Sequence, residues 1–178
     1  MTIYVLEGPD LAGKTTLADE ITKIHHERGD AVMKRKMSQP DREATQLDLF
    51  GEYFRAVQWA ALTSERDTHV IFDRLHVGEW IYGHHKRGNS LLTFEQITAL
   101  DQLLDSVQAK KIFVDVEYDA LALRYRQRGD DYVNLADLAT ISHDYRDMLF
   151  RHNDTRQPDL FGWNRVFMTG GEVPDVVS

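Results

Sequence analysis

Short runs of apolar residues alternate along the chain with longer stretches in which apolar residues recur at helical spacing. Five short runs predict β-strands over residues 3–6, 31–37, 70–72, 111–116 and 165–168. Between them, apolar residues three or four positions apart predict a helix that ends near Gly29 and further helices over about 44–62, 94–107 and 138–148. Residues 75–88 mix aromatic residues, glycines and a basic cluster, and no element is predicted there.

This alternation of buried strands and helices is typical of a parallel sheet covered on both faces. The sequence therefore predicts a three-layer α/β fold with a five-stranded parallel sheet. In such folds, ligands gather at the carboxyl ends of the strands. No internal repeat or linker interrupts the pattern, so we expect residues 1–178 to form a single domain.

Composition narrows the classes of function. The net charge of −8, from 21 basic and 29 acidic residues, argues against binding an extended nucleic acid without a local basic patch, but it leaves room for a small anionic ligand. The chain has no cysteine, which excludes disulfides and thiolate zinc sites. Without a signal-peptide pattern at its start or an apolar stretch of about 20 residues, the sequence predicts a cytoplasmic protein that does not enter the membrane.

The turn after the first strand carries a phosphate-binding motif. Residues 8–15 read Gly-Pro-Asp-Leu-Ala-Gly-Lys-Thr and fit G-x-x-x-x-G-K-[ST] between a strand and a helix. In this motif the backbone amides and the helix start face a polyphosphate, Lys14 reaches the β and γ phosphates, and the Thr15 hydroxyl ligates Mg²⁺. The motif predicts a bound nucleotide and Mg²⁺ as the metal. The expected contacts to ATP come from Gly8, Ala12, Gly13, Lys14, Thr15 and Thr16.

A second carboxylate supports the same prediction. Asp73 closes the apolar strand 70–72, where an acidic residue holds the metal through water, and Arg74 follows it directly. A nucleotide-dependent binding switch is the competing class. The guanine-reading N-K-x-D motif of a GTPase is absent and no D-x-x-G stands in a suitable place, which weakens that alternative.

Residues 6–16, Leu-Glu-Gly-Pro-Asp-Leu-Ala-Gly-Lys-Thr-Thr, resemble the loop of the thymidylate kinase family, one of the P-loop nucleoside and nucleotide kinases. The acid within that loop, Asp10 here, faces the sugar and acceptor phosphate in the family. Pro40-Asp41-Arg42 is similar to the family's P-E-R segment, which implies that Arg42 grips the acceptor phosphate. Asp73-Arg74 with the downstream Gly78, Ile81 and Tyr82 is similar to the family's D-R motif, and Arg74 is implied to orient the same phosphate.

The segment 123–131, Leu-Arg-Tyr-Arg-Gln-Arg-Gly-Asp-Asp, resembles the arginine-rich lid of that family, and we expect a lid over about residues 124–134. Phosphoryl transfer depends on positioning and charge stabilisation, so arginines in an otherwise acidic chain suit the transferred γ-phosphoryl group. On a helix, Arg124 and Arg128 share a face and are expected to converge on one anion, whereas Arg126 points elsewhere.

Two departures from the family bear on the acceptor. Leu11 stands where some members carry a basic residue, so the lid must supply the catalytic charge. Gln39 precedes Pro40, where nucleoside kinases of the superfamily use a glutamate as base. A monophosphate oxygen is already ionised and needs no base, so Gln39 favours a nucleoside monophosphate as acceptor. The argument stays open because Asp10, Glu43 or Glu79 could replace that base.

Candidate base-binding residues lie on the predicted helix 44–62 and beyond it. Phe54 and Tyr82 are candidates to stack on a pyrimidine, and Gln58 offers hydrogen-bonding groups to a base edge, although an aromatic stripe also suits a core. The eight histidines show no helical pair with a third carboxylate, so no zinc site is predicted. We expect surface or loop positions for these histidines, which are His25, His26, His69, His76, His84, His85, His143 and His152.

Together these features predict an ATP- and Mg²⁺-dependent kinase that phosphorylates a deoxynucleoside monophosphate, with dTMP favoured. The alternatives are a deoxynucleoside kinase, a kinase of a modified pyrimidine hydroxyl such as 5-hydroxymethyluracil in DNA, and the binding switch. The resemblance further implies a homodimer through helices beside the Asp73-Arg74 segment.

Overall fold

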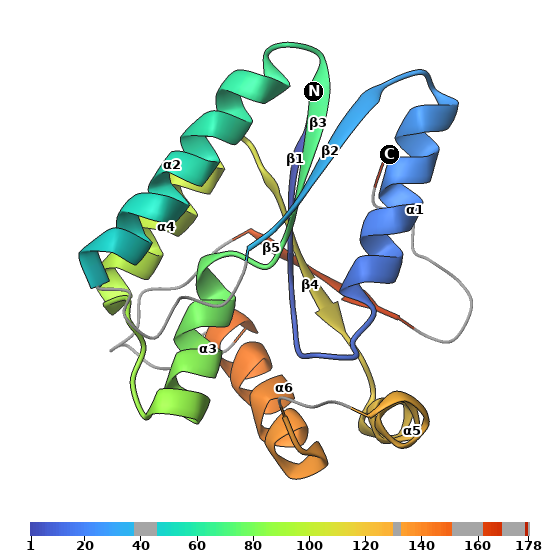
Figure 1. The fold of residues 1–178 in the computed structure, drawn as a ribbon, viewed down its shortest axis with the longest axis vertical. Helices are drawn as coiled ribbons and strands as arrows, with labels where there is room; N and C mark the ends of the chain where they lie inside the picture. The colour runs from blue at the N-terminus through green and yellow to red at the C-terminus, as the bar shows by residue number, and fades with distance from the viewer. Residues whose placement is uncertain (38–45, 130–132, 151–161, 169–176, 178) are drawn as a thin grey trace.

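The computed structural model describes residues 1–37, 46–129, 133–150, 162–168 and 177. Its five strands form one parallel sheet in the order β2-β3-β1-β4-β5 (Figure 1). The strands are β1 (Ile3–Glu7), β2 (Ala31–Lys36), β3 (Thr68–Asp73), β4 (Lys110–Asp115) and β5 (Trp163–Phe167). The helices are α1 (Lys14–Glu27), α2 (Gln46–Ser64), α3 (His76–Arg87), α4 (Phe94–Ser106), α5 (Tyr118–Arg128) and α6 (Leu135–Phe150).

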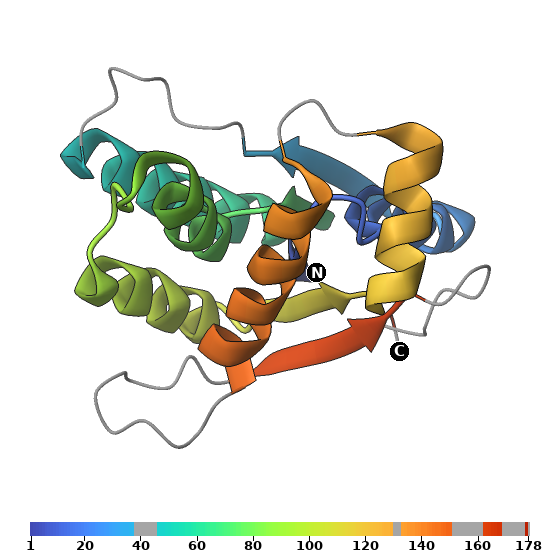
Figure 2. The ribbon, with the colours of Figure 1, turned by 90° about the horizontal axis from the view of Figure 1, so that it is seen from below.

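The sheet lies between two helical layers. Helix α1 packs on β1, β2 and β3 from one side, and α2 packs on β1 and β3 from the other, with α4 beside it (Figure 1). Helices α3, α5 and α6 lie toward the end of the sheet at which β1 leads into α1 (Figure 2). The predicted α/β fold with a five-stranded parallel sheet is thereby confirmed.

The central strands form the core because both of their faces are covered. Every residue of β1 is buried, and so are the middle residues of β3 and β4. Leu6 lies opposite Asp73 and Glu7 opposite Phe113, so the carboxyl ends of these three strands are level with one another. This register brings residues from three distant parts of the sequence to one edge.

Helices α3 and α5 are the elements that the apolar pattern did not predict, and α3 is the one that lies in a stretch taken as irregular. Gly78 and Gly83 lower its intrinsic helix propensity, and the basic cluster at its end obscures the apolar period. Tertiary packing outweighs this, because Val77, Ile81 and Tyr82 are buried against the rest of the molecule. The segment taken for an irregular stretch is therefore a helix that follows Arg74 almost at once.

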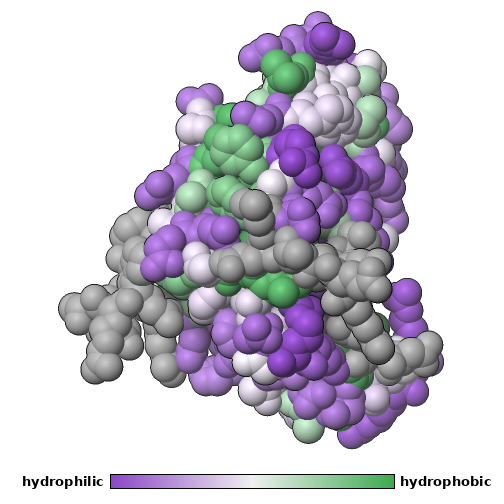
Figure 3. Space-filling view, turned by 60° about the vertical axis from the view of Figure 1, so that its left-hand side comes forward, coloured by the Kyte–Doolittle hydropathy of each residue, from purple (hydrophilic) through white to green (hydrophobic). Residues whose placement is uncertain are grey.

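The helices and the surface of the described residues bear on the expectations about the membrane and about a dimer. No helix among the described residues is both long and apolar enough to cross a membrane. The face seen in Figure 3 is mainly hydrophilic, with small and separate apolar areas. Exposed apolar side chains on α2 include Trp59 and Leu62. The single domain, the homodimer and the cytoplasmic location stay predictions.

Candidate active site

The loop between β1 and α1 has a backbone that only glycine suits at its two ends. Gly8 has φ +147° and Gly13 has φ +105°, both in the region that other residues rarely adopt. A Cβ on Gly8 would also lie 2.3 Å from the carbonyl oxygen of Val114, at the end of β4. The loop therefore rests directly on the neighbouring strand, and α1 begins immediately after Gly13.

Lys14 is buried beneath this loop. Its Nζ donates hydrogen bonds to the carbonyl oxygens of Gly8 (2.9 Å) and Pro9 (2.7 Å). Burial, and then the nearby Arg74 charge, lower the pKa of Lys14 to about 7, although the surrounding carboxylates offset part of the effect. The ammonium group is thus held at the phosphate-binding loop in an environment that lacks enough negative charge to stabilise it fully.

Thr15 and Asp73 lie together beside Lys14, as the sequence predicted for a metal site. The Thr15 hydroxyl donates to Asp73 Oδ2 at 3.3 Å. Asp73 Oδ1 is buried without a hydrogen-bond partner among the described residues. Because Mg²⁺ takes oxygen ligands and usually keeps several waters, an unsatisfied carboxylate oxygen next to a hydroxyl fits such an ion.

Asp10, Arg74 and Tyr82 meet on the other side of the loop. Arg74 Nη2 pairs with Asp10 Oδ1. The Tyr82 hydroxyl oxygen accepts hydrogen bonds from the Asp10 amide (2.8 Å) and from Arg74 Nη2 (3.2 Å), and the guanidinium lies 4.3 Å from the Tyr82 ring centroid. Burial alone would raise the pKa of Asp10, but the Arg74 and Lys14 charges outweigh it and hold that pKa below its usual value. The result is a fixed cation and an ionised acid beside the phosphate-binding loop.

Arg124 contacts the loop from behind. Its Nη1 donates to the carbonyl oxygens of Leu11 and Ala12, each at 2.9 Å, and its Nη2 donates to the Met168 carbonyl at 3.0 Å. Arg128 lies exposed at the end of α5. The structure therefore assigns Arg124 a contact with the loop backbone, which the shared helix face with Arg128 did not predict.

The other residues predicted to bind the acceptor are not seen to join Asp10 and Arg74. Arg42 and Glu43 lie outside the described residues. Phe54 and Gln58 are exposed on α2, whereas their neighbour Tyr53 is buried. Of the three residues proposed for the base, the structure brings only Tyr82 into contact with Asp10 and Arg74.

Glu79, considered above as a base, is committed to other contacts. Its carboxylate pairs with Arg87 and accepts the Leu91 amide at 2.9 Å. The side chain is buried, and this burial raises the pKa of Glu79. Glu79 therefore holds the end of α3 to the loop that follows it.

Sequence analysis gave Glu7 no role, although Glu7 stands in the quoted motif and contacts the start of α3. Its buried carboxylate accepts hydrogen bonds from the Leu75 and Gly78 amides and from the Tyr145 hydroxyl. The available signal was an acidic residue ending an otherwise apolar strand, since a charge in that position needs partners.

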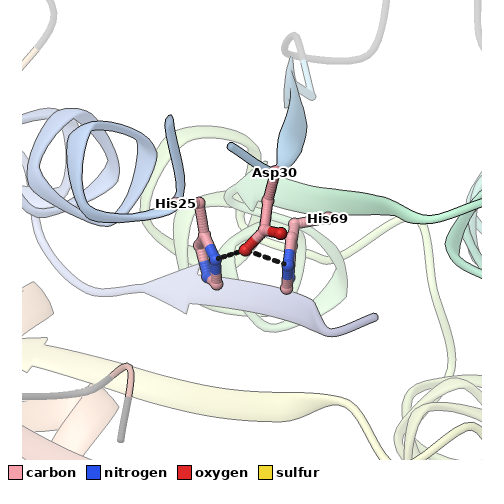
Figure 4. A group of neighbouring side chains, drawn as sticks. All are labelled: His25, Asp30 and His69. Atoms are coloured by element: carbon pink, nitrogen blue, oxygen red, sulfur yellow. Dashed lines mark hydrogen bonds and ion pairs between the residues drawn. The ribbon is translucent and has the colours of Figure 1, made fainter. Parts of the chain in front are cut away.

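The expectation that the histidines occupy surface or loop positions is wrong for three of them. His25, His69 and His76 are buried. His25 Nδ1 lies 3.1 Å and His69 Nε2 lies 3.4 Å from the same Asp30 Oδ2, which bridges the two rings (Figure 4). Each ring lies within ion-pair distance of a carboxylate, which is Asp30 for His25 and His69 and Asp101 for His76. Such a partner cannot be read from helical spacing.

This cluster has metal-ligand residue types but not the geometry of a metal centre. The His25 and His69 rings are stacked, with centroids 3.5 Å apart and planes at 25°, whereas a shared metal must lie near the plane of each ring. The Thr2 amide also donates to His69 Nδ1 at 3.1 Å, which leaves the proton of the neutral ring on Nε2, facing Asp30. In this arrangement, called here the His–Asp–His stack, Asp30 is hydrogen-bonded to His25 and lies within ion-pair distance of the stacked His69 ring.

Comparisons with known proteins agree with this fold. No family model matches the chain. It is 26% identical over 149 residues to the uncharacterized SPbeta prophage-derived protein YorR of Bacillus subtilis (strain 168), covering 84% of this chain and 82% of that one. The crystal structure of B. subtilis YorR in complex with phosphorylated GDP is similar with a TM-score of 0.64 and 21% identity, covering 94% of this chain and 85% of that chain.

A looser likeness, with a TM-score of 0.45 and 15% identity, links 93% of the chain to 90% of a deoxyadenosine kinase from M. mycoides solved with dCMP and dCDP. At that score the likeness carries no functional argument. The architecture, a five-stranded parallel sheet with the motif loop between β1 and α1, is the fold that this chain shares with YorR.

Proposed function

We propose that this protein transfers the γ-phosphoryl group of ATP to a deoxynucleoside monophosphate, with dTMP as the first acceptor to test. The observation that carries the proposal is that two groups of residues lie on opposite sides of one loop. Lys14, Thr15 and Asp73 lie on the donor side, and Arg74 with Asp10 lies on the acceptor side. YorR, which shares the fold, was crystallised with phosphorylated GDP, a phosphorylated nucleotide.

On the donor side, the loop amides and the start of α1 hold the ATP phosphates, and Lys14 turns from the loop carbonyls toward them. Thr15 and, through water, Asp73 would hold Mg²⁺, which when bound would neutralise charge on the donor phosphates. The donor side also includes four residues expected to contact ATP, which are Gly8, Ala12, Gly13 and Thr16. These residues position the γ-phosphoryl group.

On the acceptor side, Arg74 binds the phosphate of the monophosphate, and Arg42 binds the same phosphate as a second cation. Asp10 then turns to the sugar, and Tyr82 flanks both groups. Phe54 and Gln58 of α2 are proposed to close on the base.

The choice of a monophosphate rests on the lack of a suitable base among the described carboxylates of the site. The Arg74 and Lys14 charges hold the pKa of Asp10 low, which makes it a weak base, and Glu79 is bound to Arg87 and the Leu91 amide. A nucleoside hydroxyl needs such a base, whereas a monophosphate oxygen is already ionised near neutral pH. The arrangement therefore favours the monophosphate over the nucleoside.

In this mechanism Arg128 supplies positive charge to the phosphoryl group during transfer. Arg124 uses its guanidinium on three carbonyls and keeps the loop in place. Both arginines support catalysis, but through different steps.

The test is an acceptor screen with ATP and Mg²⁺. It compares the four deoxynucleoside monophosphates with thymidine, with DNA containing 5-hydroxymethyluracil and with no acceptor. We expect diphosphate formation from dTMP, and loss of nearly all turnover in Lys14→Ala with the fold intact. Faster phosphorylation of thymidine or of the modified DNA would select one of those alternatives. Slow ATP hydrolysis that no acceptor stimulates would support the binding switch.

A further inference from the structure

Glu7 is a charged residue in the middle of the hydrophobic core. It ends β1, its side chain is fully buried, and it lies one residue before the phosphate-binding loop. Its Oε1 accepts the Leu75 amide at 2.8 Å and the Gly78 amide at 3.1 Å, and its Oε2 accepts the Tyr145 hydroxyl at 3.1 Å. Burying a carboxylate is costly unless it is hydrogen-bonded, so these contacts need a compensating role.

The two amides belong to the start of α3. Leu75 is the N-cap residue of this helix, and no side chain caps it locally. The first amides of a helix have no partner within it, and a carboxylate close to them is favourable. Glu7 therefore caps α3 from a strand that lies 68 positions earlier in the chain.

Arg74 lies between this cap and β3, in a constrained backbone. Its φ is +69°, which is rare for a residue other than glycine, and its amide donates to the Leu6 carbonyl at 2.9 Å. Leu6 and Glu7, which are adjacent in β1, thus hold Arg74 and Leu75, which are adjacent in the turn. That turn directs the Arg74 guanidinium to Asp10 and Tyr82.

We propose that Glu7 is a positioning residue for the acceptor phosphate: its carboxylate fixes the turn that aims Arg74. The inference rests on the proposed function, because it assigns Arg74 to the acceptor. Tyr145 brings α6 to the same carboxylate, so α6 and α3 are both held at one oxygen pair. Glu7 itself is shielded from the substrate by this packing.

Gly78 offers a way to test the contact without changing a charge. A Cβ at this position would lie 3.1 Å from Glu7 Oε2 and 3.2 Å from the Tyr145 hydroxyl, which is tighter than an ordinary contact. Gly78 lies within α3, where alanine is otherwise favoured over glycine. Gly78→Ala therefore displaces the carboxylate while it strengthens the helix.

Gly51→Ala is the matched control. Gly51 also lies within a helix, and its added Cβ would meet only the end of the exposed Arg55 side chain, at 3.1 Å. That side chain can move away at little cost. The control carries the same helix-stabilising change without the effect on Glu7.

Steady-state kinetics and thermal unfolding are measured for Gly78→Ala, Gly51→Ala, Glu7→Ala and Glu7→Gln. We expect Gly78→Ala and Glu7→Ala to raise the acceptor KM by about tenfold or more, because small misplacements of binding groups are expensive, and to leave the ATP KM within about twofold. Gly51→Ala keeps both constants. Glu7→Gln recovers most of the loss, since its amide oxygen still accepts the two backbone hydrogens.

An unchanged acceptor KM in folded Gly78→Ala would overturn the inference, as would an equal rise of both constants. If Glu7→Ala does not fold, Gly78→Ala decides alone. A wild-type protein that phosphorylates no acceptor would refute the proposed function instead. In that case a crystal structure of Gly78→Ala tests the positioning role separately: the inference predicts that Arg74 leaves Asp10, and an unmoved pair rejects it.

Discussion

Lys14 lies where two requirements conflict. Its side chain must be buried under the loop to reach the phosphates, and burial disfavours its charge. The carbonyls of Gly8 and Pro9 partly replace the missing solvent. A triphosphate would supply the negative charge that this lysine lacks, so binding of the nucleotide is coupled to protonation of a side chain.

That coupling predicts proton uptake when nucleotide binds. With a pKa of about 7, Lys14 is largely neutral at pH 8 in the free protein and charged once the phosphates surround it. Calorimetric titrations with a Mg²⁺-loaded, non-hydrolysable ATP analogue, run at pH 8 in two buffers of different ionisation enthalpy, should show uptake that vanishes at pH 6. The Lys14→Met variant should show none at either pH. A wild-type binding enthalpy that does not depend on the buffer at pH 8 would contradict the assignment.

The residue scale also shows where sequence reasoning succeeds and fails. The loop bounded by Gly8 and Gly13 and the contact of Thr15 with Asp73 were predictable, because they follow from local backbone and fixed spacing. The contact of Arg124 with the loop carbonyls was not, since the direction of a long side chain depends on neighbours far along the chain. The same limit explains the buried histidines and the role of Glu7.

At the scale of elements, α5 contacts the phosphate-binding loop through its middle, whereas its last turn is exposed. Arg124 lies in the middle of the helix and bonds the loop, whereas Arg128 lies in the last turn. Helix α3 is the converse case: it was not predicted because two glycines and a basic end hide its period, yet it carries Tyr82, which contacts Asp10 and Arg74. Packing partners thus determine both elements more than their local sequence does.

The two arginines of α5 should therefore give different kinetic signatures. Arg128→Ala is expected to lower kcat by about a hundredfold with little change in either KM, because its contact forms chiefly in the transition state. Arg124→Ala is expected to raise the ATP KM by about tenfold, because the loop loses two hydrogen bonds and its link to the Met168 carbonyl. Arg126→Ala, which alters an exposed arginine on another face, is the control and should leave kcat and both KM values unchanged. Identical effects of the first two variants would contradict this division of roles.

The His–Asp–His stack ties the end of α1 to β3 and predicts acid sensitivity. Burial and the neighbouring His25 charge lower the pKa of His69, although Asp30 opposes the shift. The unfolded chain, with a histidine pKa of about 6.5, binds the proton more readily, so stability is present above that pH and is lost as the pH falls through the folded-state pKa. The pKa of Asp30 is lowered by the His25 hydrogen bond, which adds a loss of the same sign at lower pH.

Urea unfolding between pH 7 and pH 5 tests this prediction. His69→Gln should flatten the decline in the free energy of unfolding that wild type shows. The exposed His26→Gln serves as the control and should follow wild type. The groups that face the His69 ring are His25, Asp30, Tyr4 and the N-terminal amine, and none of them changes in these variants. If the free energy of unfolding of His69→Gln declined as steeply as that of wild type, the acid sensitivity would arise at another site.

At the scale of the whole molecule, the parallel sheet was predictable because buried strands read as short apolar runs between helical segments. The order of the strands was not, since apolar period records burial and carries no information about which strand lies beside which. Lateral pairing places β1 in the centre, between β3 and β4, and so sets the phosphate-binding loop in the middle of the carboxyl edge. The predicted homodimer is equally a matter of surfaces that the apolar period does not specify.

The direct contact between the phosphate-binding loop and β4 has a consequence for biosynthesis. Gly8 packs against the carbonyl of Val114, which the ribosome adds about a hundred residues later. Parallel pairing supplies only contacts between distant segments, and such contacts form slowly. The nascent chain can pair β1 with β3 first, but it must expose the other edge of β1 until β4 has emerged. Nucleotide can therefore stabilise the protein only as a late event in its maturation.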